Sequence, residues 1–212
     1  IREVKTVFKP NTYPLNLKGT SLLRLTVNIK GAILLGFLAI SSITYAGTNS
    51  FSLEGLDTIK LNFTDGSKYE GQVVECLLNK KKARCMQGLG IYSTHTGHKY
   101  KGYFKNNKPD GYGLFTSIDG QSYEGSFKKG ELSGKGIMNY SDGRKYKGNF
   151  EKNKLEGYGV MTYPSGRIYG EGSRYEGEWK KDKRDGKGRM IYLDDGRELK
   201  GWFKDNVFIK KQ

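Results

Sequence analysis

The feature that most constrains this chain is an internal repeat whose copies follow one another without gaps. Residues 98–120, 121–143 and 144–166 align throughout, and each contains Tyr-x-Gly-x-Phe, a polar turn and then Gly-x-Gly. Looser copies begin at Tyr69 and Tyr175. One such unit is too short to bury its own aromatic residues, so neighbouring copies must stack against one another.

Each copy is predicted to be a β-hairpin. In the middle copy, Tyr123, Gly125 and Phe127 are two residues apart and therefore share one face of a strand. Gly134 and Gly136 share a face of the following strand, where they leave room for aromatic rings. The chain contains 30 Gly without a G-X-Y period, which excludes collagen and argues against a helical bundle.

Both kinds of turn contain residues that suit tight hairpins. Most copies end in Asp-Gly, as at Asp119-Gly120. Within a copy, the position three residues after the Phe or Trp holds a residue type that tolerates positive φ. These turn residues are Asn107, Gly130, Asn153, Asp182 and Asn206.

The repeat predicts an all-β fold, a solenoid-like array of stacked antiparallel β-hairpins. We expect five repeats plus a half repeat, which begins at Leu199, over residues 67–206. Residues 47–66 are expected to form an N-terminal cap strand and residues 207–212 a C-terminal tail. The aromatic residues expected in the core are Tyr100, Phe104, Tyr123, Phe127, Tyr146, Phe150, Tyr175, Trp179 and Trp202.

The clearest copy, YEGEWKKDKRDGKGRMIYLDDG at 175–196, closely resembles the MORN repeat (membrane occupation and recognition nexus). The resemblance covers residues 67–206. It departs from the family pattern at Val73, which stands in place of an aromatic residue, and at Leu199, which replaces the Tyr. The resemblance implies a rod-like array without catalysis of its own, used for scaffolding, oligomerisation or acidic phospholipid binding.

No combination of residues predicts catalysis or cofactor binding. His95 and His98 flank a Thr-Gly turn without a third ligand nearby, so we interpret them as turn residues. Gly134-Lys135-Gly136 and Gly186-Lys187-Gly188 lack the phosphate-loop frame and are interpreted as repeat glycines. We therefore expect no enzymatic activity, no cofactor, no bound metal and no small-molecule substrate.

Residues 1–46 are expected to be an N-terminal extension that directs the chain to a membrane. The segment 31–46 is uncharged and mostly apolar, follows basic residues, and ends in small residues. This pattern predicts a helical signal-peptide segment, cleaved after Ala46, and export to the periplasm or the exterior. One alternative is a retained membrane anchor, although a spanning helix needs about 20 apolar residues. Another is a buried segment of a soluble core.

Cys76 and Cys85 lie in an insertion in the first hairpin. If the chain is exported, a disulfide across the base of this loop is the favoured interpretation. The alternative is two unpaired cysteines packed as small apolar residues.

Basic residues concentrate in the turns within each copy. The chain has a formal net charge of +15, and these turns account for much of the positive charge outside the N-terminal extension. In a stacked array they would lie along one side, suited to anionic lipid headgroups or an acidic partner. The alternative is that they maintain solubility and protect exposed turns. This candidate basic edge consists of Lys80, Lys81, Lys82, Arg84, Lys105, Lys108, Lys128, Lys129, Lys152, Lys154, Lys180, Lys181, Lys183 and Arg184.

The residue between the Tyr and the Gly of each copy alternates in charge. Equivalent positions would lie two strands, about 10 Å, apart, which is too far for tight ion pairs. We interpret the alternation as avoiding like-charge neighbours and favouring one stacking register. The alternating residues are Glu70, Lys101, Glu124, Lys147, Glu176 and Lys200.

Together these patterns predict a non-catalytic, exported scaffold or protein-interaction module. Its expected partner is another protein or a second copy of itself. The alternative function is peripheral binding of anionic phospholipid through the basic edge. Nucleic acid is not expected as a partner, because no aromatic residues interleave the basic turns.

Overall fold

Buried and exposed residues alternate with period two in the first strand of most hairpins. The computed structural model describes residues 57–78, 80–165 and 172–211, and within them it contains thirteen β-strands. In Lys99–Lys105, for example, every second side chain is buried. This is the alternation expected of strands with one face on a core.

The strands follow one another with short connections. Their bounds are β1 Asp57–Asn62, β2 Lys68–Leu78, β3 Lys81–Ser93, β4 Lys99–Lys105, β5 Lys108–Thr116, β6 Ser122–Lys128, β7 Glu131–Asn139, β8 Lys145–Glu151, β9 Lys154–Tyr163, β10 Ser173–Lys180, β11 Lys183–Tyr192, β12 Glu198–Lys204 and β13 Val207–Lys211.

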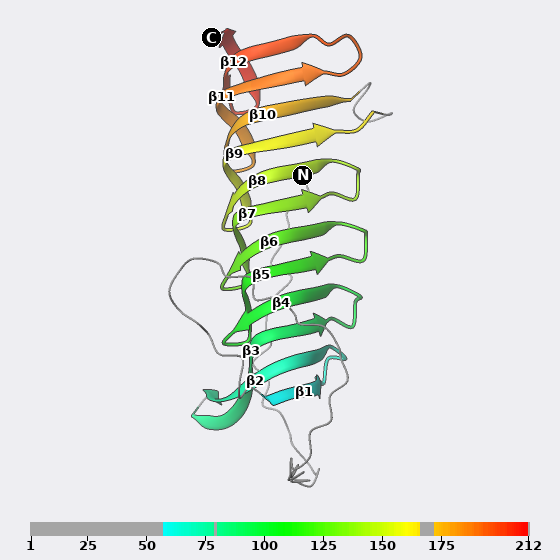
Figure 1. The fold of residues 1–212 in the computed structure, drawn as a ribbon, viewed down its shortest axis with the longest axis vertical. Helices are drawn as coiled ribbons and strands as arrows, with labels where there is room; N and C mark the ends of the chain where they lie inside the picture. The colour runs from blue at the N-terminus through cyan, green and yellow to red at the C-terminus, as the bar shows by residue number, and fades with distance from the viewer. Residues whose placement is uncertain (1–56, 79, 166–171, 212) are drawn as a thin grey trace, which may run out of the picture.

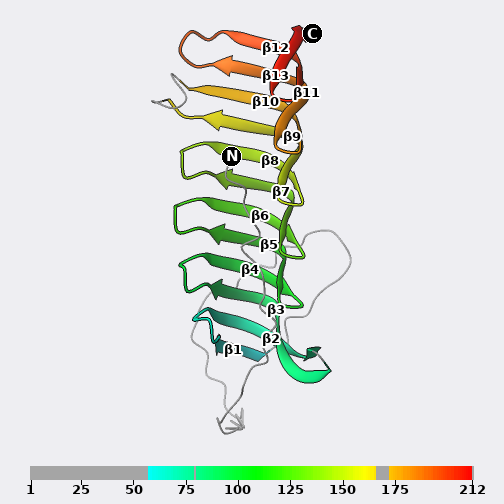
Figure 2. The same ribbon diagram turned by 180° about the vertical axis from the view of Figure 1, so that it is seen from behind.

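All thirteen described strands belong to one sheet, in which the spatial order is the sequence order. Every adjacent pair is antiparallel, so each hairpin is hydrogen-bonded to the next through its backbone. Figures 1 and 2 show the resulting ladder of strands, with turns along both long sides. The predicted array of antiparallel hairpins is confirmed. Its hairpins join edge to edge in a continuous sheet and do not wind around an axis.

The two ends of the array differ in how they match the prediction. β1 lies in the segment expected to form the N-terminal cap strand and pairs with β2. The expected C-terminal tail instead contributes β13, which pairs with β12 because Val207–Lys211 continues the repeat as a second hairpin strand. The predicted helical segment at 31–46, with the rest of the extension 1–46, lies outside the described residues.

Paired glycines explain why each copy contains Tyr-x-Gly followed by Gly-x-Gly. Gly125 of β6 lies opposite Gly136 of β7. A Cβ atom on Gly125 would lie 2.6 Å from the Cα atom of Gly136 and 2.6 Å from the hydroxyl oxygen of Tyr123. The Tyr123 ring therefore lies against bare backbone, a space that only glycine leaves open.

A β-bulge follows each glycine pair and is capped by the same tyrosine. The register of β6 against β7 shifts between Gly125 and Phe127, which leaves Ser126 without a partner in β7, although it pairs with Tyr112 of β5. The Tyr123 hydroxyl donates a hydrogen bond to the Ser126 carbonyl oxygen at 2.9 Å. The corresponding tyrosines Tyr69, Tyr100, Tyr146 and Tyr175 donate to the carbonyl three residues later in the same way.

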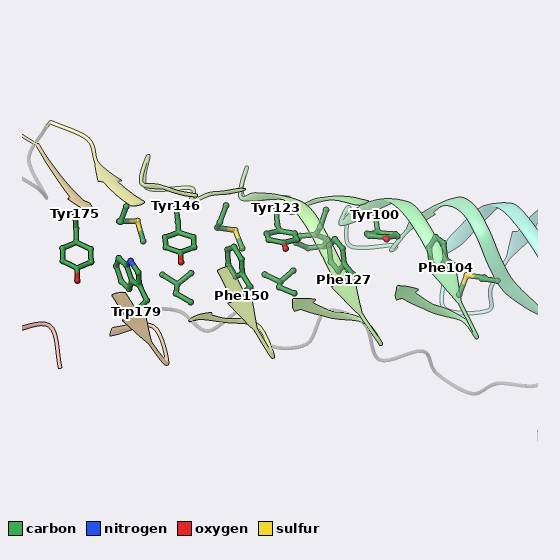
Figure 3. Packing of buried hydrophobic residues seen from close by; sticks show 14 of the residues in the cluster. Tyr100, Phe104, Tyr123, Phe127, Tyr146, Phe150, Tyr175 and Trp179 are labelled. Carbon is green, nitrogen blue, oxygen red and sulfur yellow. The ribbon is translucent and has the colours of Figure 1, made fainter. Parts of the chain in front are cut away.

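The core is a ladder of aromatic rings that runs the length of the array. Phe127 packs edge to face against Tyr123 of its own hairpin, at 5.1 Å between ring centroids, and against Tyr100 of the preceding hairpin, at 4.9 Å. Figure 3 shows these rings between two layers of ribbon. The same alternation continues from Tyr69 to Phe203. Such pairs stabilise by about 0.5–1.5 kcal/mol beyond the burial of their area.

Trp202 does not belong to this core, contrary to the sequence-based expectation. Its side chain is 38% exposed, whereas the adjacent Phe203 is only 3% exposed and packs on Tyr175. Phe203 lies four residues after Leu199 in the strand and shares its face, because side chains alternate between faces. Trp202 therefore projects from the opposite face. The other eight predicted core aromatics are buried.

The turns within the hairpins, here called tip turns, link neighbouring hairpins. Asn153 has φ of 67° and follows Lys152, whose φ is 49°, as in a two-residue type I′ turn. The Asn153 amide N–H donates to the Leu132 carbonyl of the preceding hairpin, and the Leu132 N–H donates to Asn153 Oδ1 at 2.8 Å. Asn107, Asp182 and Asn206 make the same reciprocal pair with a residue of the preceding hairpin.

Gly130 is the exception among the tip turns, and its partner shows why. Gly130 has no side-chain acceptor, and the residue it faces, Pro109, has no N–H to donate. The Gly130 N–H still donates to the Pro109 carbonyl oxygen at 2.7 Å. The tip turn that lacks a side-chain acceptor therefore faces the residue that lacks an N–H, so neither Gly130 nor Pro109 has an unpaired backbone group in this contact.

Candidate interaction surfaces

The sheet exposes three surfaces that could meet a partner. One long side consists of the tip turns and the other of the Asp-Gly turns, on the left and right of Figure 1 respectively. The third is the outer face of the sheet, opposite the aromatic core. The outer face consists of the strand residues whose side chains point away from the ring ladder.

The first hairpin contains a Cys76–Cys85 disulfide, as the sequence suggested for an exported chain. Cys85 is buried, and Asn107 Nδ2 of the next hairpin lies 3.1 Å from its sulfur. Within the described residues there are no free cysteines. The disulfide joins β2 and β3 at the base of the extended end of their hairpin. Figure 1 shows this extension at the lower left.

The basic residues predicted from the sequence do gather at the tip turns. All of them except Arg184 are exposed. Lys183 is held by an ion pair, with its Nζ 2.7 Å from Asp205 Oδ1 of the next tip. Beside it, Lys204 pairs with Asp185 at 2.9 Å, so the C-terminal tips are partly neutralised.

Arg184 was wrongly assigned to the exposed basic edge. Its guanidinium lies 5.7 Å from the ring centroids of both Tyr175 and Phe203, and its Nη2 donates to the Asn206 carbonyl at 2.8 Å. In the register of its hairpin Arg184 lies opposite Trp179, as Leu132 lies opposite Phe127. It therefore occupies a core-facing position and covers the last rings of the ladder.

A hollow of about 660 Å³ lies between two successive tips. Lys105 and Lys108 line one side, and Lys128 and Lys129 line the other. Asp110 lies between them and accepts a hydrogen bond from the Lys129 backbone N–H at 3.1 Å, so its carboxylate is engaged with the turn. Among the described residues, these four lysines take part in no ion pair.

The residues of alternating charge lie in one row across the outer face, here called the charge row. Cross-strand pairing places an aliphatic residue between successive charges at most positions, such as Ile137 between Glu124 and Lys147. The backbone ladder sets the register between hairpins directly, so any effect of the charges on register remains a prediction. The charge row consists of Glu70, Lys101, Glu124, Lys147, Glu176 and Lys200.

In the described part of the chain, two acidic residues of the charge row are paired, and its two central lysines are not. Glu176 forms ion pairs with Arg189, at 2.9 Å from Nη2, and with Arg174, at 2.7 Å from Nη2. The hydrogen bond from Arg189 lowers the pKa of the Glu176 carboxyl group. Lys60 Nζ lies 3.4 Å from Glu70 Oε1 at the N-terminal end of the row. Within the part of the chain that the structure describes, Lys101 and Lys147 have no ion pair.

An apolar cleft of about 540 Å³ opens on the outer face near the N-terminal end of the array. Leu89, Tyr103, Tyr112 and Leu114 line it, with exposed fractions from 42% to 57%. On this face the sequence pattern drew attention only to the alternating charges, and these apolar residues were not predicted. The signal was available, since apolar residues at the alternate positions of a strand must face the other side.

Chemical sites other than these surfaces are not evident in the described ranges. There, no group of three or more His, Cys, Asp or Glu side chains is arranged to hold a metal. His98 Nδ1 lies 3.1 Å from Ser117 Oγ, and the imidazole stacks on Phe115. In 57–78, 80–165 and 172–211, no helix is long and apolar enough to cross a membrane.

Comparison with known families identifies the repeat. The model of the MORN repeat matches residues 100–122, 123–143, 146–166 and 175–197. Each match covers most of one of the four hairpins from β4 to β11. No curated protein matches the chain.

Proposed function

The chain is a MORN-repeat protein, and from this premise we propose that it is a non-catalytic scaffold that binds another protein through the outer face of its sheet. The observation that supports this function is the apolar cleft beside the charge row. Leu89 and Tyr112 are 43% and 57% exposed there. The opposite face of their strands packs against the ring ladder. Large exposed apolar side chains that gather in a hollow are typical of protein-binding surfaces.

Site-specific photo-crosslinking tests this function. A benzophenone amino acid at Tyr112 should capture a protein partner in the cells that make the chain. The same group at Ile118, an exposed apolar residue in an Asp-Gly turn, is the matched control and should capture little. Absence of any crosslinked protein at Tyr112, or equal capture at both positions, would contradict the proposal.

We also propose that the scaffold is exported. The Cys76–Cys85 disulfide supports export, because disulfides persist in oxidising compartments and are rare in the cytosol. The signal-peptide pattern at 31–46 supports it independently, with membrane anchoring as the alternative. The intact mass of the native protein tests both points. Loss of residues 1–46 and a deficit of two hydrogens are expected, and a mass that includes 31–46 would contradict cleavage.

A second candidate function, binding of anionic phospholipid, is favoured by the hollow between the tips. Its four lysines are exposed and unpaired within the described residues, so they could receive phosphate groups. We expect Lys105→Glu with Lys128→Glu to reduce binding to vesicles that contain phosphatidylserine. The control Lys68→Glu with Lys99→Glu changes charge equally on strands away from the tips.

Ionic strength separates the two functions. Lipid binding through lysines should weaken steeply as salt rises, because the Debye length falls from about 10 Å at 0.1 M to about 3 Å at 1 M. Association through Leu89 and Tyr112 should persist in salt because it depends on apolar burial. Vesicle binding that is unchanged by salt, or equal for neutral vesicles, would contradict the lipid function.

A further inference from the structure

The charge row has a symmetry that defines a specific partner. Read from β2 to β12, its signs run negative, positive, negative, positive, negative, positive. Such a row is complementary to its own reverse. Building on the proposed outer-face function, we propose that the partner is a second copy of this chain, packed outer face to outer face with its repeats running in the opposite direction.

The centre of the row lies at one residue. Cross-strand pairs connect Glu124 to Ile137 and Ile137 to Lys147, so Ile137 is the midpoint between the two central charges. Three charges lie on each side of it. A two-fold axis parallel to the strands, which passes beside Ile137 between the two sheets, would therefore bring the row of one copy face to face with the reversed row of the other.

This axis places an opposite charge across each of the six residues of the charge row. Glu124 faces Lys147 of the second copy, and Lys101 faces Glu176. At the ends, Glu70 faces Lys200. A dimer with the repeats in the same direction would instead place like charges against each other, which costs free energy and disfavours that arrangement.

The central charges of the row have no opposite charge beside them in the described part of their own chain. Successive members are two strands, about 10 Å, apart, so they cannot pair with one another. Lys101 and Lys147 have no ion pair among the described residues, and Glu124 accepts only the Tyr112 hydroxyl, at 2.8 Å. Facing side chains of a second sheet would supply the missing partners for all three.

Apolar residues between the charges match in the same arrangement. Ile137 meets its own copy on the axis, and Leu114 meets Val160, which lies equally far on the other side. In the adjacent row, Tyr112 of β5 and Tyr158 of β9 are also symmetric about β7 and would face each other. Both tyrosines are more than half exposed in the single chain, at 57% and 58%.

The shape of the sheet permits this packing over a long distance. Figures 1 and 2 show strands that stay nearly parallel from β2 to β12, so the charge row runs along one face. Eleven strands at about 4.8 Å span about 50 Å, and three rows of side chains span about 15 Å. The contact would bury on the order of 750 Å² per copy, as stable protein interfaces do.

Some contacts oppose the arrangement. Arg189 lies in the same cross-strand line as the charge row and would face the apolar Ile91 of the second copy. In the row on the other side, Lys99 would face Arg174, which has the same charge.

Lys135 of β7 is exposed and lies on the axis in the adjacent row, so it would meet its own copy. This like-charge contact weakens the dimer. Lys135→Gln should therefore tighten association, an effect that the same substitution at Lys154 in a tip should not produce.

A charge swap tests the pairing by sedimentation of the full chain over a range of concentrations. Lys147→Glu creates two like-charge contacts with Glu124 and should weaken the dimer roughly ten-fold or more. Adding Glu124→Lys in the same chain restores opposite charges and should restore the affinity. Lys154→Glu is the matched control, since it makes the same charge change at a tip and should leave association unchanged.

Cysteine crosslinking tests the direction of the second copy. Ile137→Cys lies on the proposed axis and should form a disulfide-linked dimer under mild oxidation. Val160→Cys faces Leu114, so it should not link to itself, but it should link to a Leu114→Cys chain when the two are mixed. Self-linking of Val160→Cys, or a failure of Ile137→Cys to link, would overturn the antiparallel arrangement.

The outcomes separate this inference from the proposed function. A wild-type chain that sediments as a monomer at all concentrations overturns self-association. It leaves the scaffold function intact if the benzophenone at Tyr112 captures another protein. If Tyr112 captures neither a second copy nor another protein, the proposed function fails as well. A dimer that survives Lys147→Glu unchanged overturns the charge-row pairing alone.

Discussion

Single residues in the tip turns hold adjacent hairpins together by supplying both a donor and an acceptor. Asn153 shows the requirement most clearly, because its backbone and its side chain each bond to Leu132 of the preceding hairpin. Leu132 is buried, so its N–H has no access to solvent if the side-chain acceptor is removed.

We predict that Asn153→Gly destabilises the protein by about 1–3 kcal/mol, because it leaves the buried Leu132 N–H unpaired while keeping the positive φ accessible. Asn153→Asp keeps the acceptor and should preserve stability at neutral pH. Gly130→Asn is a second control, since Pro109 has no N–H to use a new acceptor. Urea unfolding measures all three, and equal losses for Asn153→Gly and Asn153→Asp would refute the role of the acceptor.

At the scale of the hairpin, the glycine pair and the tyrosine act as one unit. We predict that Gly125→Ala costs several kcal/mol, because the new Cβ would lie 2.6 Å from backbone atoms of β7 that cannot move aside. Gly120→Ala is the matched control: its Cβ meets nothing within 4 Å, and it costs only the strain of a φ of 85°. Thermal unfolding compares the two variants, and similar losses of stability would contradict the packing explanation.

The disulfide should stabilise its own hairpin and leave distant hairpins unaffected. All strand pairs with extensive contacts are sequence neighbours, so stability in this array is local. Replacing Cys76 and Cys85 with Ser should raise hydrogen exchange in β2 and β3, with a cost of up to about 2–3 kcal/mol for a loop of this length. Exchange in β8 and β9 should not change. A uniform rise in exchange along the chain would show that the sheet unfolds as one unit.

For the whole molecule, five buried tyrosines couple stability to alkaline pH. Burial raises the pKa of Tyr69 and of Tyr175 from 10.0 to about 12, and it raises the pKa of Tyr100, Tyr123 and Tyr146 further. The unfolded chain loses these protons near pH 10, while the folded chain keeps them. Their contribution is therefore fully present below pH 10 and is lost as the pH rises toward 12 and beyond.

We predict a steep, cooperative alkaline unfolding in which tyrosinate absorbance and the loss of β-structure in circular dichroism change together. Tyr123→Phe removes one buried ionisable group and should make the pH dependence shallower, although it also removes the hydrogen bond to Ser126. Tyr112→Phe is the control at an exposed position. Ionisation of all tyrosines near pH 10 without unfolding would contradict the coupling.

The repeat period and the residue types within it were sufficient to predict hairpins, turn positions and most core rings. The disulfide was favoured only on the condition that the chain is exported. Errors arose where a position had to be assigned to one of two faces. Trp202 and Phe203 are adjacent aromatic residues in the half copy, and only the strand register decides that Phe203 is buried. Arg184 is basic like its neighbours in the tip, but its register places it opposite Trp179 in the core.

By itself, the sequence determined the period, the hairpin and the chemistry of each turn, because these depend on residues close together in the chain. Only the tertiary structure decided that hairpins join through backbone hydrogen bonds into one continuous sheet, and hence which side chains form the outer face. The reason is that many backbone groups find their partners in a neighbouring copy of the repeat. The Leu132 N–H, for example, donates to Asn153 Oδ1 of the next copy. The cleft and the unpaired charges of the outer face are consequences of that joining.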